Sequence, residues 1–189
     1  MKKALIVIIA IVAVIGILAA IVAGMYNGFV SAEESLKNAQ SQVGVQLQRR
    51  ADLIPNFVAT VKGYSDYEQS TLTAVTEARA SVGKAQTVAE QQAAGTELDK
   101  AISVWVNAVT EAYPDLKADA QYVALQDELA GTENRVATAR KDYNKVAESY
   151  NLKIRRFPSN IFAGMFGFQK ADYFEADDSA STVPSVDFS

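Results

Sequence analysis

The stretch "LQDELAGTENRVATARKDYNKVAESYNLKIRRF", residues 125–157, decides the fold class. Apolar or small residues return every three or four positions along all of it, which is the period of one face of an α-helix. Phe157-Pro158 ends the pattern, because proline restricts the backbone of the residue before it. We therefore predict one helix over residues 115–157. Its predicted buried face consists of Leu125, Leu129, Thr132, Val136, Ala139, Tyr143, Val146, Tyr150, Ile154 and Phe157.

The N-terminal part carries two further apolar ladders, each with the seven-residue step of a coiled coil. They predict that an N-terminal apolar helix runs on into the first helix of a bundle. The first ladder is Phe29, Leu36, Val43, Phe57 and Tyr64, with Arg50 in the missing place. The second ladder is Leu47, Ile54, Val61, Val75 and Val82.

Two more helices are expected between the long ones. The first covers about residues 66–92 and ends before Gly95, and the second covers about residues 96–112. Tyr113-Pro114-Asp115 is a turn, in which Asp115 is a candidate cap of the last helix. No stretch has the pattern of a strand. The predicted fold is all-α, an antiparallel bundle of three to four long helices behind an N-terminal anchor.

Residues 4–25, "ALIVIIAIVAVIGILAAIVAGM", contain no charge. About 20 apolar residues in a helix cross the hydrocarbon core of a bilayer. The run exceeds the roughly 7–15 apolar residues of a cleaved signal peptide, which is the competing interpretation. Lys2 and Lys3 precede it and favour a cytoplasmic N-terminus, which places the bundle outside the cytoplasm. We expect a retained, single-pass transmembrane helix.

One face of this helix carries small residues at a spacing of four, namely Gly16, Ala20, Gly24 and Gly28. Small residues let a second helix approach closely in lipid, where packing drives association. Glycine and alanine are common in membrane spans, so chance is the alternative. The functional hypothesis is a helix-packing face for self-association.

The composition excludes several classes of protein. The chain has no Cys and no His, which removes disulfides, thiolate nucleophiles, imidazole bases and Cys/His metal sites. The carboxylate pairs Glu33-Glu34 and Asp127-Glu128 are adjacent, so their members point in different directions on a helix. A phosphate-binding glycine loop is absent from the sequence. We expect a non-enzymatic protein with no catalytic, cofactor-binding or metal site.

The charge is unevenly distributed along the chain. Residues 1–170 hold 18 Lys and Arg against 17 Asp and Glu, a balance of +1, whereas residues 171–189 hold five acids and no cation, a balance of −5, and together they make the net charge of −4. A nearly neutral body with an acidic tail argues against a nucleic-acid interface.

Arg49, Arg50 and Pro55 form an unusual group in the first ladder. Arg49 is placed to pair with Asp52 at i+3. Arg50 takes a position that is expected to be apolar, so it extends along the bundle, contacts a partner helix or meets a lipid phosphate. Pro55 cannot donate a hydrogen bond to the Ala51 carbonyl and is expected to kink the helix. A structural kink is favoured over a binding site.

The segment "IFAGMFGF", residues 161–168, is too short to cross a membrane. The favoured interpretation is that it folds back and caps the bundle core. The alternative is an exposed apolar contact for a neighbouring subunit or for the bilayer interface. The side chains concerned are Ile161, Phe162, Met165, Phe166 and Phe168.

Several ordered blocks resemble the LemA family. They are "YNGFV" at 26–30, "VQLQRRADLIPNFVATVKGY" at 45–64, "AYPDLKA" at 112–118, "LQDELAGTENRVATARKDYN" at 125–144 and "FPSNIFAGMFGFQKADYFEA" at 157–176. The resemblance implies a bacterial membrane protein with one N-terminal span and a bundle of long antiparallel helices. It implies no catalytic residues, because no enzymatic activity is established for the family.

Four parts are predicted, namely an anchor at residues 1–28, a LemA-like bundle at 29–158, an apolar and aromatic segment at 159–176 and an acidic tail at 177–189. The expected function is a scaffold of the bacterial inner membrane that contacts the lipid bilayer and forms a homo-oligomer. The alternative is a monomeric anchored adaptor that binds another envelope protein.

Overall fold

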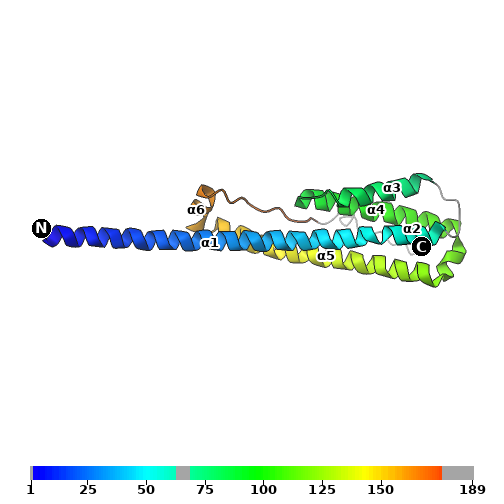
Figure 1. Ribbon diagram of the computed structural model, residues 1–189, viewed down its shortest axis with the longest axis horizontal. Helices are drawn as coiled ribbons and strands as arrows, with labels where there is room; N and C mark the ends of the chain where they lie inside the picture. The colour runs from blue at the N-terminus through cyan, green and yellow to red at the C-terminus, as the bar shows by residue number, and fades with distance from the viewer. Residues whose placement is uncertain (1, 63–68, 176–189) are drawn as a thin grey trace, which may run out of the picture. The chain divides into compact units, whose positions relative to one another are not determined.

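The computed structural model describes residues 2–62 and 69–175 and places them in helices and their connections (Figure 1). The helices are α1 (Lys2–Asp52), α2 (Ile54–Lys62), α3 (Gln69–Val82), α4 (Val88–Ala112), the 3-10 helix η1 (Pro114–Ala118), α5 (Ala120–Arg155) and α6 (Ser159–Met165). No strand occurs in these two ranges, and the all-α prediction is confirmed. Tyr64 and the predicted acidic tail at 177–189 lie outside the described residues.

The chain forms two compact units. Unit 1 takes its residues from 1–38 and 145–171, and unit 2 takes its residues from 39–144 and 172–189. The boundaries fall inside α1 and α5, so these two helices contribute to both units. Each unit has its own apolar core.

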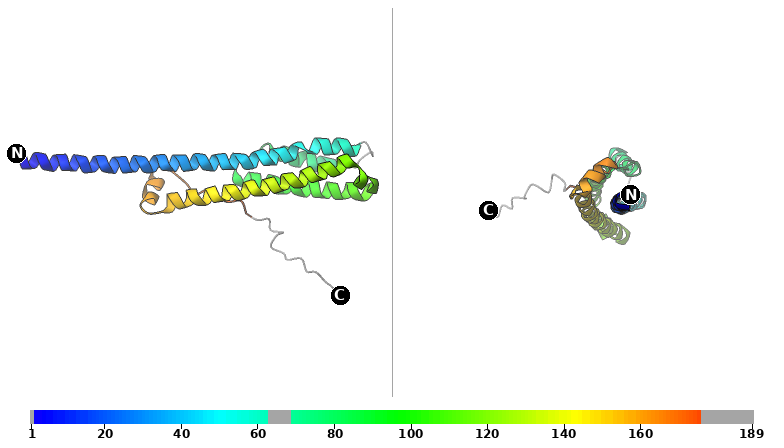
Figure 2. Two further views of the ribbon diagram at one scale, coloured as in Figure 1. Left: turned by 90° about the horizontal axis from the view of Figure 1, so that it is seen from below. Right: turned by 90° about the vertical axis from the view of Figure 1, so that its left-hand side faces the viewer.

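Unit 1 has a small core where α1, α5 and α6 meet. Phe29, Tyr150, Ile154 and Ala163 are buried in it. Figure 2 shows α6, in orange, folded against the end of α5. Removal of these apolar faces from water holds the three helices together. Partly buried residues complete the cluster, namely Met25, Ala32, Leu36, Phe162, Phe168 and Ala171.

Unit 2 has the larger core, and the predicted ladders build it. Val43, Leu47, Ile54, Phe57, Val61, Val75 and Val82 are all buried. At its centre the ring of Phe57 lies 5.0 Å from the ring of Trp105 and 5.1 Å from the ring of Tyr122, between centroids. α3 runs alongside α4 (Figure 1). The described ladder residues of this unit are thus all buried, as the seven-residue period predicts.

The connection between α3 and α4 differs from the prediction. The helix expected over about 66–92 ends at Val82, and α4 begins at Val88. Thr87 caps α4, because its hydroxyl accepts a hydrogen bond from the Glu90 amide while the Glu90 carboxylate accepts from the Thr87 amide. The hydrogen bonds from the backbone lower the pKa of the Glu90 carboxyl. This reciprocal cap fixes where the helix begins.

Gly95, which was expected to separate two helices, lies buried inside α4. A Cβ atom there would lie 3.1 Å from Cδ2 of Leu47 and would also collide with the guanidinium of Arg140. The missing side chain therefore makes room for close packing and does not end a helix.

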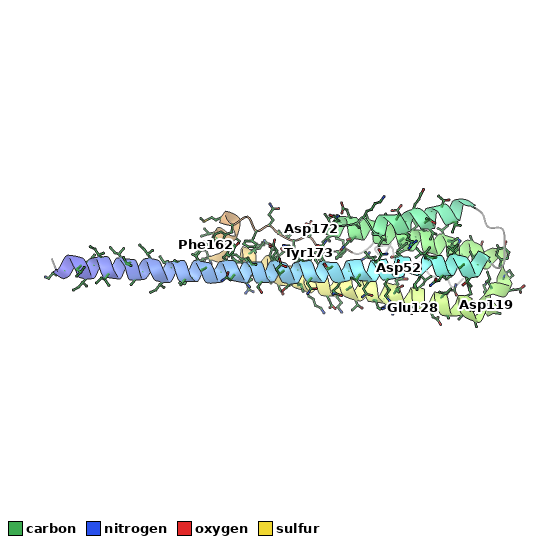
Figure 3. All side chains as sticks on the ribbon, viewed as in Figure 1. Asp52, Asp119, Glu128, Phe162, Asp172 and Tyr173 are labelled. Carbon is green, nitrogen blue, oxygen red and sulfur yellow. The ribbon has the colours of Figure 1, made fainter. Side chains whose placement is uncertain are left out.

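The start of the last helix also differs from the prediction. α5 begins at Ala120, and Asp115 lies within the short helix η1 before it. The cap is Asp119 (Figure 3), whose carboxylate accepts hydrogen bonds of 2.8 Å and 2.9 Å from the amides of Gln121 and Tyr122. The prediction of Asp115 as the cap is therefore wrong, because the chain makes a 3-10 turn first.

In unit 1, a Tyr-Asn pair on α5 clamps the non-helical segment that follows α6. The Asn151 amide group donates to the Ala171 carbonyl at 2.9 Å and accepts from the Ala171 amide at 2.8 Å. The Tyr150 hydroxyl donates to the Gln169 carbonyl at 2.9 Å. Both residues therefore bind main-chain atoms.

The same arrangement occurs in unit 2, seven residues earlier on α5. Asn144 donates to the Phe174 carbonyl at 2.8 Å and accepts from the Phe174 amide at 2.9 Å, and the Tyr143 hydroxyl donates to the Asp172 carbonyl at 3.0 Å. The Phe174 ring is buried, packs edge-on against Tyr143 and lies under the guanidinium of Arg140. The repeated "YN" at 143–144 and 150–151 is the sequence signal of these clamps.

Replacement of Asn151 by alanine is expected to loosen the clamped segment. The change leaves the amide and carbonyl of Ala171 without their partners, at a cost of about 1–3 kcal/mol. Hydrogen exchange measured by mass spectrometry is expected to show about tenfold or faster exchange in residues 168–175. Asn134→Ala, an exposed change on the same helix, is the control. Equal protection in the two variants would contradict the clamp.

The stability of unit 2 is expected to fall at alkaline pH. Burial and the nearby Asp172 carboxylate raise the pKa of Tyr143 from 10.0 to about 12. The neutral phenol is therefore favoured in the folded state, and its contribution is complete below about pH 10 and lost between about pH 10 and 12. Urea unfolding followed by circular dichroism is expected to show a steeper decline in the unmodified chain than in Tyr143→Phe. Parallel declines would rule out this linkage.

Candidate functional site

The first half of α1 is apolar and exposed on all sides within unit 1. An 18-residue window of this helix has a mean hydropathy of 3.5, and none of that window is buried. Side chains all round it, such as Leu5, Ile8 and Ile15, are more than half exposed. In the described part of the chain this is the one helix that has the length and composition to cross a membrane.

The small-residue face divides into two parts. Among the described residues, no atom beyond the adjacent residues and the backbone of the same helix lies within 4 Å of the Cβ positions of Gly16 and Gly24, and Ala20 between them is exposed. Gly28 has a different environment, because the Lys153 ammonium lies 3.2 Å from its Cβ position and donates a 2.7 Å hydrogen bond to its carbonyl. The open part of the face is therefore Gly16, Ala20 and Gly24.

The segment 161–168 packs partly against the core of unit 1 and is partly exposed. Phe162 (Figure 3) and Phe168 pack against the core of unit 1, and Phe168 lies 5.2 Å from Phe29 between ring centroids. On the other side of α6, Ile161 is 52% exposed and Met165 is 73% exposed. One face of α6 thus caps the core, while the other face is free.

The exposed apolar surface continues on either side of α6. Phe157 is 83% exposed, because α5 ends at Arg155 and its helical face ends there too. The prediction that Phe157 belongs to the buried face is therefore wrong. Phe166 is 42% exposed and lies 5.1 Å from Tyr26 of α1, in an edge-to-face contact.

A hollow of about 400 Å³ lies beside this surface, at the end of α5. Two cations, Lys153 and Arg156, line it together with Leu152, Ser149 and Ser159. These residues were not predicted as a group from the sequence. Their signal is the spacing of three and four between positions 149, 153 and 156, which places them on one face of a helix.

Arg50 is buried in unit 2 and joins three helices. Its Nε atom lies 2.8 Å from the Asp99 carboxylate of α4, which makes an ion pair. One terminal nitrogen donates to the Leu129 carbonyl of α5 at 2.8 Å, and the other lies 3.4 Å from the exposed carboxylate of Glu133. The predicted apolar position therefore holds a charge that its partners neutralise.

Arg49 and Pro55 lie next to this network. Arg49 is exposed and lies 3.8 Å from Glu128 (Figure 3), whereas Asp52, its expected partner, is 3.7 Å from Arg79. α1 ends at Asp52 and α2 begins at Ile54, so the helix is interrupted at Leu53, two residues before Pro55. Pro55 itself is exposed. The structure thus brings Arg50 into the core and leaves Arg49 and Pro55 on the surface of unit 2.

Within the described residues, no group of three His, Cys, Asp or Glu side chains is arranged to hold a metal ion. Of the acidic pairs in the sequence, Glu33 and Glu34 pair with Lys37, and Glu128 pairs with Arg135. The surroundings of these carboxylates are therefore those of ordinary surface ion pairs.

Replacement of Arg50 by methionine is expected to destabilise the protein far more than the same change at Arg49. Arg50→Met removes the cation that pairs with Asp99 and that donates to the Leu129 carbonyl, at a cost of about 2–4 kcal/mol, because Asp99 is only partly exposed. Arg49→Met removes a surface pair worth at most about 1 kcal/mol. Urea unfolding of the full chain in mild detergent measures both, and equal effects would contradict the assigned network.

Comparison with known proteins agrees with this architecture. The sequence pattern of the LemA family matches residues 39–188, which is more than half of the chain. Magnetosome proteins MamQ 1 and MamQ 2 of Paramagnetospirillum magneticum are each 28% identical over 182 residues, covering 83% of this chain and 67% of each relative. Protein LemA of Metamycoplasma hominis is 26% identical over 167 residues, covering 87% of this chain and 75% of that protein. The chain therefore belongs to the LemA family.

Proposed function

We propose that this protein is a non-enzymatic scaffold of the bacterial inner membrane. It crosses the bilayer once through the first half of α1 and self-associates there, with its helical bundle outside the cytoplasm. The observation that carries the proposal is the make-up of α1, an uninterrupted helix of 51 residues. Its N-terminal part is apolar with no covering side chains, and its C-terminal part carries the buried ladder.

The first half of α1 needs an apolar environment. Removal of a side chain such as leucine or isoleucine from water is worth about 1.5–3 kcal/mol, and this helix presents such side chains on every side. Residues 4–25 measure about 33 Å as a helix, which matches a hydrocarbon core of about 30 Å. Lys2 and Lys3 favour an N-terminus in the cytoplasm.

Self-association is supported by the open face of Gly16, Ala20 and Gly24. Lipid solvates apolar helices as well as another helix does, so close backbone packing decides whether two spans pair. Within unit 1 nothing occupies this face, and the helix beyond it uses Gly28 for an internal contact. The spans are therefore able to pair without disturbing the core of unit 1.

A non-catalytic role is supported by the residues and by the relatives. The chain lacks Cys and His, and the carboxylates described above are paired on the surface. The names of the relatives, magnetosome protein MamQ and protein LemA, refer to no reaction. Packing and anchoring are the physical tasks that this arrangement of helices performs best.

The mass of the full chain in mild detergent, measured by light scattering, tests self-association. The unmodified chain is expected to give a homogeneous oligomer, and both Ala20→Leu and Gly24→Leu are expected to give a monomer. Ala19→Leu is the matched control, because it makes the same change at the same depth about 100° away around the helix. It is expected to leave the oligomer intact.

The other outcomes are equally informative. A monomer in the unmodified chain would overturn self-association and would favour the monomeric adaptor that binds another envelope protein. An oligomer that survives both stripe variants would show that the spans do not hold it together.

A further inference from the structure

We propose that the elbow between α5 and α6 is a second membrane contact that binds the headgroup of an anionic phospholipid. The hollow lined by Lys153, Arg156 and Ser159 takes the phosphate, and the exposed face of α6 enters the interfacial layer. The proposal rests on the membrane anchoring of α1 proposed above. All the residues concerned belong to unit 1.

The depth of the hollow fits a headgroup. If residues 4–25 fill the hydrocarbon core, Gly28 lies three residues, or about 4.5 Å, beyond its edge. The headgroup layer extends roughly 5–8 Å outside the core on each side. Lys153 donates to the carbonyl of Gly28, so the hollow beside it lies at the depth of lipid phosphates.

The chemistry of the hollow fits an anion. The Lys153 ammonium uses one of its three N–H groups on Gly28, which leaves two for a ligand. In the described residues no carboxylate lies within ion-pair distance of Arg156, and its guanidinium offers a donor fork that suits phosphate oxygens. Ser159 adds a hydroxyl, whereas the Ser149 hydroxyl donates to the main-chain carbonyl of Lys145.

The sequence around the hollow also carries an excess of positive charge. Residues 149–171 contain Lys153, Arg155, Arg156 and Lys170 and no Asp or Glu, although the whole chain has a net charge of −4. A local excess of cations at the edge of a membrane span attracts anionic lipids.

The apolar face of the elbow supplies the second half of the contact. Phe157, Ile161 and Met165 are each more than half exposed. Aromatic and apolar side chains beside cations are the composition of surfaces that lie in the membrane interface. The edge-to-face contact between Phe166 and Tyr26 ties this face to α1 directly after the apolar run. A bilayer that α1 crosses is therefore the nearest apolar phase for it.

Site-directed spin labelling tests where the elbow lies, and the lack of Cys makes single-cysteine variants straightforward. The full chain is reconstituted into nanodiscs of phosphatidylcholine with phosphatidylglycerol, with a label at Met165→Cys, Val14→Cys or Val104→Cys. The label at position 165 is expected to collide often with oxygen and rarely with a water-soluble nickel complex, as the label at position 14 does. Val104, an exposed position of α4, is expected to show the reverse.

Each other outcome overturns a defined part of the argument. A Met165 label that is open to nickel, beside a Val14 label that is not, refutes the elbow contact while α1 remains anchored. A Met165 label that neither reagent reaches shows that protein covers the face. If nickel reaches Val14, the anchoring of α1 fails, and this proposal fails with it.

Lipid retention tests the phosphate site separately. Native mass spectrometry of the chain released from the same nanodiscs is expected to show bound phosphatidylglycerol in preference to phosphatidylcholine. Arg156→Gln is expected to lower this preference about fivefold, since each cation near an anionic surface contributes about that factor. The exposed Arg49→Gln is the charge-matched control and is expected to retain it. Equal retention of the two lipids by the unmodified chain would refute the site.

Discussion

A guanidinium ion that replaces a hydrocarbon in the core constrains the whole of unit 2. Arg50 stands where the seven-residue ladder requires an apolar side chain, and it is only 4% exposed. A buried charge is tolerated only when other groups replace the water that it has lost. Asp99 and the carbonyl of Leu129 do so, which requires α4 and α5 to pack against α1 in one register.

This requirement explains why a helix interruption follows so closely. The second ladder must bring Ile54 and Val61 into the same core after Arg50 has been placed. α1 stops at Asp52, and α2 starts at Ile54 with the amide of Phe57 bonded to the carbonyl of Leu53. Pro55 donates no hydrogen bond, so a break there loses little. The local sequence and the packing of Ile54 and Val61 therefore both favour a break in the helix at this position.

The parts of the fold that could be predicted are those that depend on a repeated pattern. The face of α5 and the ladders of α1 repeat over many turns, so one exception such as Phe157 does not hide them. Helix ends depend on single groups. Glycine is common at helix ends, but Gly95 lies inside α4, and Leu47 and Arg140 occupy the space where its side chain would be. Sequence alone does not reveal that contact. Thr87 and Glu90 have the Thr-x-x-Glu spacing of a capping box, but the prediction ran a helix across them.

The candidate site was less predictable, for a related reason. Lys153 and Gly28 are 125 residues apart in the chain, and nothing local in either indicates that they meet. The apolar segment 161–168 was recognised from composition, yet composition could not say which of its side chains face the core. Ala163 is buried and Met165 is 73% exposed because two residues of a helix lie about 200° apart, which turns these two side chains to opposite sides of α6.

The two Tyr-Asn clamps together fix the number of residues between the main-chain groups that they bind. The two clamps are seven residues apart on α5, which is a step of about 10.5 Å along the helix. The main-chain groups that they bind are three residues apart, which is a step of about 10 Å in nearly extended chain. Because they bind only main-chain atoms, their hydrogen bonds do not depend on which side chains the clamped segment carries. These hydrogen bonds do depend on the number of residues in that segment. A lineage is therefore free to exchange residues such as Gln169, whereas the loss or gain of one residue between Ala171 and Phe174 would leave one clamp without its match.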